Sequence, residues 1–296
     1  MIVGEALLSL AQRTACSDLA IVGTAKNAGK TVTARAIMQA AQLRGAAIGV
    51  TSIGRDGEAV DSTDAVRKPR LGLRRGAIVA TALGALTASP AFELLDVTSR
   101  LTAAGKLAVV RLRTDAFVEL VGPPTASGVR YALDRMRDYG ATITILDGAL
   151  DRVAALAGGR EAIVVAVGAS GVRTFGEALD EIAALVAKLS LRTCDPDKTA
   201  IRVDGALTAA RATQLIAEYG ESPLIVRDPT RLALTGKALL GLLDQIDVRV
   251  EQPLRVIAVS IASIGRDHSF APREFLHGVA RVTKLPTFDV YAGAAA

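Results

Sequence analysis

The segment from Ala20 to Val32, AIVGTAKNAGKTV, constrains the fold more than any other part of the chain. It joins an apolar run that ends at Gly23 to a loop of small and polar residues, and then to an Ala-rich helical pattern that begins at Lys30. A buried strand, a glycine-containing turn and a helix in this order are typical of a parallel α/β sheet. We therefore expect an α/β fold.

The loop nearly matches the phosphate-binding pattern G-x-x-x-x-G-K-[ST], with Gly29, Lys30 and Thr31 at its last three positions. Counting back puts Thr24 where the pattern has its first glycine, and Gly23 lies one residue earlier. Phosphate binding requires converging backbone N–H groups and a helix N-terminus rather than glycine at every position. The alternative is a glycine turn before a helix that happens to contain Lys-Thr. Because the strand and helix flank the loop as required, we interpret it as a functional variant.

This interpretation predicts that the loop binds ATP with Mg²⁺. Lys30 would reach the β and γ oxygens, and Thr31 would offer its hydroxyl to the metal ion. Lys26 would contact phosphate or simply be solvated, and we prefer the second. The predicted nucleotide-binding residues are Gly23, Thr24, Ala25, Lys26, Asn27, Ala28, Gly29, Lys30, Thr31 and Val32.

Apolar runs alternate with helical patterns along most of the chain, which favours a doubly wound, mostly parallel sheet. The pattern predicts strands at 19–23, 46–53, 76–82, 106–112, 117–122, 141–147 and 161–170, and helices at 30–45, 126–140 and 176–189. The composition shifts at 192–198, which suggests a nucleotide-binding core over 1–192 and a C-terminal α/β lobe over 193–296. That lobe either stands apart or continues the same sheet.

The composition indicates what kind of core the protein has and which ligands and compartment are expected. Half of the 296 residues are hydrophobic and only 3% are aromatic, which suits the aliphatic core of a parallel sheet. The net charge of +5 comes without interleaved aromatic residues, so nucleic-acid binding is not expected. The two cysteines, without C-x-x-C spacing, favour a reducing cytoplasm.

Residues 76–92 carry no charge, but they are too few to span a membrane and contain Gly84 and Pro90. We interpret this run as a buried strand followed by a turn and the start of a helix.

Two acids are candidates for metal binding and catalysis. Asp147 follows the apolar run ATITIL and would hold Mg²⁺ through water if its strand neighbours the strand at 19–23. Its alternative is an Asp-Gly turn at a strand end. Asp56 lies just past the second strand, where it would approach Mg²⁺ or orient attacking water. Glu58 competes for that role, and an Asp-Gly turn is again the alternative. We predict Lys30, Asp56 and Asp147 as catalytic, and Thr31, Asp56 and Asp147 as metal-binding.

Several other residues have two interpretations each. Asp151 and Arg152 contribute to the site or act as a helix cap and a solvated base. The strings SIGRD (at 52 and 263) and DGAL (at 147 and 204) each occur twice, which indicates similar turns after strands or an ancient duplication. The second SIGRD, with His268 just after it, would contact the nucleobase.

The string GTAKNAGKTV resembles the loop of dethiobiotin synthetase and of the wider P-loop class that includes the MinD/ParA ATPases. The resemblance covers about the first fifty residues. It implies ATP and Mg²⁺ as ligands, but the second strand of the ligase ends in a lysine that holds the amine substrate. The corresponding place here is near Thr51 and Ser52, which counts against dethiobiotin synthesis.

A wider resemblance covers most of the chain. The strings GTAKNAGKT, TSIGRDGE, ELVGP, ILDGALDR, FAPREFLHGV and LPTFDV look like the ATPase subunit of lysine 5,6-aminomutase reactivase. It implies an ATP-driven factor that, with a second reactivase subunit, restores an adenosylcobalamin-dependent aminomutase. A homodimer is a further expectation from the class. The alternatives are an ATP-dependent small-molecule ligase and a regulatory module that binds nucleotide without hydrolysing it.

Overall fold

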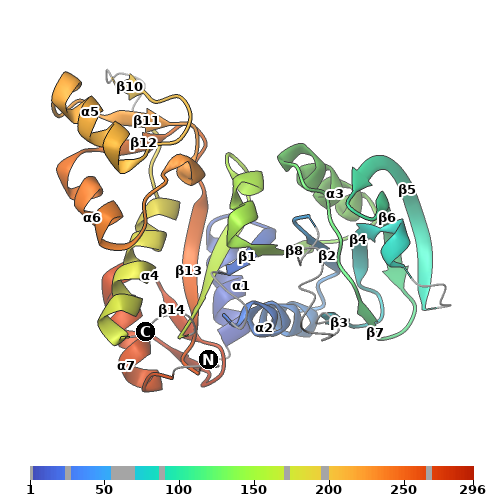
Figure 1. Ribbon diagram of the computed structural model, residues 1–296. Helices are drawn as coiled ribbons and strands as arrows, with labels where there is room; N and C mark the ends of the chain where they lie inside the picture. Colours follow the sequence, from blue (N-terminus) through green and yellow to red (C-terminus); the bar gives the residue numbers. More distant parts are fainter. Residues whose placement is uncertain are drawn as a thin grey trace, which may run out of the picture. The chain divides into compact units, whose positions relative to one another are not determined.

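The computed structural model describes residues 3–23, 28–54, 71–86, 91–169, 174–194, 200–264 and 269–296. The chain divides into two compact units (Figure 1). The first comprises Met1–Gly23 and Lys30–Ala155, and the second comprises Thr24–Gly29 and Leu156–Ala296. Both units combine helices with parallel strands, and the large sheet is mostly parallel, so the expected α/β class is confirmed.

The first unit contains three α-helices and eight strands among its described residues. The helices are α1 (Val3–Arg13), α2 (Lys30–Leu43) and α3 (Ala126–Asp138), with 3-10 turns η1 (Leu83–Ala85) and η2 (Leu150–Leu156). The strands are β1 (Asp18–Gly23), β2 (Ile48–Ser52), β3 (Leu71–Leu73), β4 (Ile78–Ala82), β5 (Phe92–Thr102), β6 (Gly105–Leu112), β7 (Ala116–Val118) and β8 (Ile143–Ala149).

The strands of the first unit run in the order β1-β8-β2-β4-β6-β5, with β3 and β7 paired separately. β1, β8, β2 and β4 are parallel, and every residue of β1, β2 and β4 is buried. Helix α2 packs against α1, β1 and β8, while α3 packs on β2 and β4. In Figure 1, α2 and α3 lie on opposite sides of these strands, which is compatible with a doubly wound fold.

The described residues of the run 76–92 contain the expected strand and the 3-10 turn η1, but no start of an α-helix. Residues 92–102 instead form β5, which pairs with β6 in an antiparallel hairpin. Gly105, at a φ of 104°, starts β6 after the turn, in backbone geometry that favours glycine. The strand expected at 117–122 is confirmed only at Phe117 and Val118, the last two residues of β7 (Ala116–Val118), which pairs with β3.

In the second unit, β9 (Ala162–Gly168), β13 (Arg255–Ala262) and β14 (Thr287–Asp289) are parallel, and β15 (Ala294–Ala295) is antiparallel to β14. Helices α4 (Phe175–Leu189) and α7 (Pro272–Thr283) pack against each other and on these strands.

A small lobe between α4 and β13 has a core of its own. It contains the parallel strands β10 (Ile201–Arg202), β11 (Leu224–Val226) and β12 (Val248–Val250), helices α5 (Ala209–Tyr219) and α6 (Gly236–Gln245), and the 3-10 turn η3 (Pro229–Arg231). The lobe follows α4, which ends at Leu189, whereas the two units divide between Ala155 and Leu156. Beyond the lobe, β13 pairs with β9, which precedes the lobe in the chain.

No helix among the described residues combines the length and apolar composition that crossing a bilayer requires. The described part of the charge-free run 76–92 contains β4 and the turn η1.

Candidate functional site

The described part of the predicted loop has the expected strand and helix at its ends. β1 is buried along its whole length and ends at Gly23, and α2 begins at Lys30. Ala28 and Gly29 are buried, while Lys30, Thr31 and Val32 are half-buried in the first turn of α2. Thr24, Ala25, Lys26 and Asn27 lie outside the described residues. The flanks required by a phosphate-binding loop are therefore present.

The side chain of Lys30 folds back over Gly23. A β-carbon built on Gly23 would lie 2.4 Å from Cγ and 2.5 Å from Cδ of Lys30, and 3.1 Å from its Nζ. Any other residue at position 23 would displace the lysine, because such contacts are far shorter than van der Waals distance. Glycine at position 23 therefore leaves room for the side chain of Lys30 at the end of β1.

The other end of the loop has two features suited to anions. Gly29 adopts a φ of 87°, which favours glycine, and leaves its backbone uncovered by a side chain of its own. Helix α2 carries no acidic residue in its first turn. No carboxylate of that turn neutralises the positive N-terminal end of the helix, so this end can attract an anion.

Asp147 lies on the strand beside the loop-bearing strand. β8 pairs in parallel with β1, placing Asp147 opposite Ile21, and pairs with β2, placing it opposite Ser52. β8 continues to Ala149, so Asp147 and Gly148 lie within the strand and not in a turn after it. Atom Oδ1 of Asp147 is shielded from solvent. The condition set for its metal role, a strand adjacent to β1, is met.

Asp56 and Glu58 lie outside the described residues, but Ile53 and Gly54, which precede them, are held by hydrogen bonds to two different segments. The N–H of Ile53 donates to the carbonyl of Asp147 over 3.0 Å, and the N–H of Gly54 donates to the carbonyl of Pro123 over 2.9 Å. Arg152 donates to the carbonyl of Ile53 over 3.0 Å, so it is not merely a solvated base.

Thr51 and Ser52, at the place where dethiobiotin synthetase has its lysine, are both buried. The hydroxyl of Thr51 donates to the carbonyl of Ala80 over 2.8 Å. Ser52 donates to the carbonyl of Gly54 and accepts from the N–H of Gly122, both over 2.9 Å. These hydroxyls hold neighbouring backbone, and neither is exposed to a substrate.

The second SIGRD string also begins at the end of a parallel strand. Ser263 directly follows β13 and donates to Oδ2 of the fully buried Asp289 over 3.1 Å. Its surroundings differ from those of Ser52, but each string begins at the end of a parallel strand. Residues 265–268, including His268, lie outside the described residues. Sequence reasoning did not single out Asp289, although an acid that ends an apolar run shortly before Gly293 is a turn signal.

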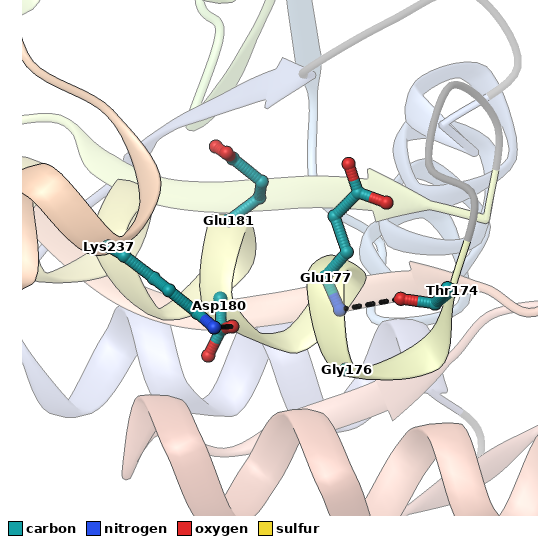
Figure 2. Close-up of a pocket in the computed structure, with 6 residues that line it drawn as sticks. All are labelled: Thr174, Gly176, Glu177, Asp180, Glu181 and Lys237. Atoms are coloured by element: carbon teal, nitrogen blue, oxygen red, sulfur yellow. Dashed lines mark hydrogen bonds and ion pairs between the residues drawn. The ribbon is translucent and has the colours of Figure 1, made fainter.

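A shallow surface pocket of about 490 Å³ lies in the second unit, at the start of α4 (Figure 2). Glu177, Asp180 and Glu181 line it, and Lys237 of α6 pairs with Asp180 at 3.4 Å. Figure 2 also shows Thr174 capping α4 by accepting from the N–H of Glu177. Three carboxylates beside one cation would repel phosphate groups, so this pocket does not suit a nucleotide.

Within the described ranges, no cluster of three or more His, Cys, Asp or Glu side chains is arranged to hold a metal ion. A magnesium site would here combine a hydroxyl, one carboxylate and water, as Mg²⁺ sites with bound nucleotide commonly do. Comparison of the chain with protein-family models, curated proteins and solved structures finds no match.

Proposed function

We propose that this protein is a Mg²⁺-dependent ATPase whose nucleotide binds at the loop between β1 and α2. The observation that carries the proposal is the contact of the Lys30 side chain with Gly23 at the end of a buried strand. This geometry keeps a primary amine at the loop, beside a helix N-terminus without acidic residues in its first turn. An amine and a helix N-terminus attract the same ligand, a phosphate chain.

Each residue has a distinct role in the proposed reaction. Lys30 and the backbone of Gly29 would bind the phosphates, and Thr31 and Asp147 would hold Mg²⁺. The metal ion neutralises charge that develops on the transferred phosphoryl group. Asp56 would orient the attacking water. The adjacency of β8 to β1 supports the role of Asp147, because it brings this acid to the strand that carries the loop.

The more specific proposal is a reactivating factor, acting with a second subunit on an adenosylcobalamin-dependent aminomutase in the cytoplasm. It rests on the wide resemblance of the sequence strings. The buried hydroxyls of Thr51 and Ser52 favour it over a ligase that holds an amine substrate with a lysine at this place. A ligase and a non-hydrolysing nucleotide sensor are the alternatives that the test must separate.

The first experiment measures Mg·ATP binding by calorimetry and phosphate release on the same preparations. It compares the wild type, Lys30→Ala and the control Lys237→Ala, whose side chain is 84% exposed on α6. We expect Lys30→Ala to abolish binding and Lys237→Ala to leave it unchanged. Absence of nucleotide binding to the wild type at millimolar ATP would overturn the proposal.

A second experiment separates the alternatives. Purified aminomutase added to the wild type should stimulate phosphate release if the protein is a reactivating factor. Turnover that depends on a small acid or amine would identify a ligase instead. Tight ATP binding without hydrolysis, with or without the aminomutase, would identify a regulatory module.

A further inference from the structure

We propose that Tyr291 contacts the nucleoside part of the bound nucleotide, and that the buried carboxylate of Asp289 fixes the turn that carries it. This inference rests on the proposed function, because it assumes that phosphate groups bind at the loop. It adds a contact to the nucleoside from the turn after β14, which lies outside the phosphate-binding loop pattern.

The turn after β14 borders the end of the loop. A β-carbon built on Gly29 would lie 3.4 Å from Cγ2 of Val290 and 3.8 Å from Cε2 of Tyr291. Gly29 immediately precedes Lys30, so the edge of the tyrosine ring borders the residue whose backbone would approach the phosphate chain. We therefore place the nucleoside of a nucleotide bound at the loop over the surface next to Gly29, where the tyrosine ring lies.

Asp289 holds this turn in one conformation. Its Oδ1 accepts from the backbone N–H groups of Tyr291 and Ala292, both over 2.9 Å, while Oδ2 accepts from the hydroxyl of Ser263. The side chain is fully buried, and a buried carboxylate is tolerated only when donors surround it. The backbone of Tyr291 is therefore fixed before any ligand binds, which reduces the entropy lost on binding.

Tyr291 itself is available to a ligand. The residue is 55% exposed, although its backbone N–H donates to a fully buried acid. A tyrosine ring offers a flat apolar face on which a base stacks, and the chain contains no Trp and only four Tyr. The ring thus suits the apolar part of a nucleotide whose phosphate chain lies at the backbone of Gly29.

The test compares two ligands that share phosphates and differ in the nucleoside. Binding of Mg·ATP and of Mg·tripolyphosphate is measured by calorimetry for the wild type, Tyr291→Ala and Tyr291→Phe. Tyr219→Ala is the matched control, because Tyr219 is also exposed but ends α5 in the small lobe. Thermal unfolding of each variant shows that it is folded.

We expect Tyr291→Ala to weaken ATP binding by about tenfold, the size of one base-stacking contact, and to leave tripolyphosphate binding unchanged. Tyr291→Phe should bind ATP like the wild type, because the ring face remains. Unchanged ATP binding by Tyr291→Ala, or an equal loss for both ligands, would overturn this inference and leave the proposed function intact. Failure of the wild type to bind either ligand would overturn both.

Discussion

Lys30 and Gly23 are in contact across the loop, although six residues separate them in the sequence. A β-carbon at position 23 would lie 2.4 Å from Cγ of Lys30. We therefore predict that Gly23→Ala displaces the lysine and lowers the affinity for Mg·ATP by about tenfold or more, the value of a charge-assisted hydrogen bond. Calorimetric titration with Mg·ATP measures the effect.

Gly241→Ala is the control for that variant. A β-carbon at Gly241, within α6, would meet no heavy atom within 4 Å. We expect it to leave ATP binding unchanged and to stabilise the protein by about 0.5–1 kcal/mol, because glycine is unfavourable inside helices. Equal ATP affinity for Gly23→Ala and Gly241→Ala would show that Gly23 is not needed to position Lys30.

Asp147→Asn is expected to lower phosphate release by about a hundredfold, as removal of one charge-stabilising group commonly does. The magnesium concentration needed for half-maximal turnover should rise, since an amide is a weaker ligand for Mg²⁺ than a carboxylate. Magnesium titration of phosphate release checks both effects. Asp244→Asn, at an exposed position of α6, serves as the control. A magnesium dependence identical to the wild type would exclude Asp147 from the metal site.

Gly122→Ala should destabilise the first unit by about 3 kcal/mol, because overpacking against backbone cannot be relieved by a side-chain rotation. A β-carbon at this position would lie only 1.7 Å from the carbonyl oxygen of Ser52. Ser52→Ala should cost less, about 1 kcal/mol, since the N–H of Gly122 also donates to the carbonyl of Gly54 over 3.0 Å. Urea unfolding ranks the two variants, and the reverse order would contradict the prediction.

Asp289→Asn should destabilise the second unit by about 2 kcal/mol. Two backbone N–H groups donate to Oδ1 and a hydroxyl to Oδ2, and replacing the carboxylate with an amide removes the charge that strengthens these bonds and obliges the Ser263 hydroxyl to rotate and accept. Thermal unfolding measures the loss. An unchanged midpoint would mean that the turn is held by other contacts.

Lys188 should make stability depend on pH. Burial lowers the pKa of Lys188 below its ordinary value of 10.5, with Asp228 opposing the shift. The unfolded chain then binds this proton more tightly than the folded protein does. The stability of the wild type should consequently rise, relative to Lys188→Met, as the pH increases through the folded pKa toward the unfolded one.

Urea unfolding of both proteins between about pH 8 and about pH 10 tests the sign. Lys188 also donates to the carbonyl of Leu232, so the variant should be less stable throughout. A difference in stability that does not change across this range would contradict the predicted shift.

The sequence by itself determined the local elements of this protein. The expected strand at 19–23 and helix at 30–45 agree with β1 and α2, and the helices expected at 126–140 and 176–189 agree with α3 and α4. The reason is physical, because hydrophobic periodicity, glycine turns and helix caps are encoded within a few consecutive residues. Candidate site residues on such elements, including Lys30 and Asp147, could be named without a structure.

Only the tertiary structure decided which elements are neighbours. The pairing of β5 with β6, the adjacency of Asp147 to Ile21, and the contact of the Asp289 turn with Gly29 join residues that the local pattern does not connect. β5 was not predicted from the sequence, and it pairs with β6 as an antiparallel strand. Strand order and packing depend on the free energy of the whole core, so no local pattern reveals them.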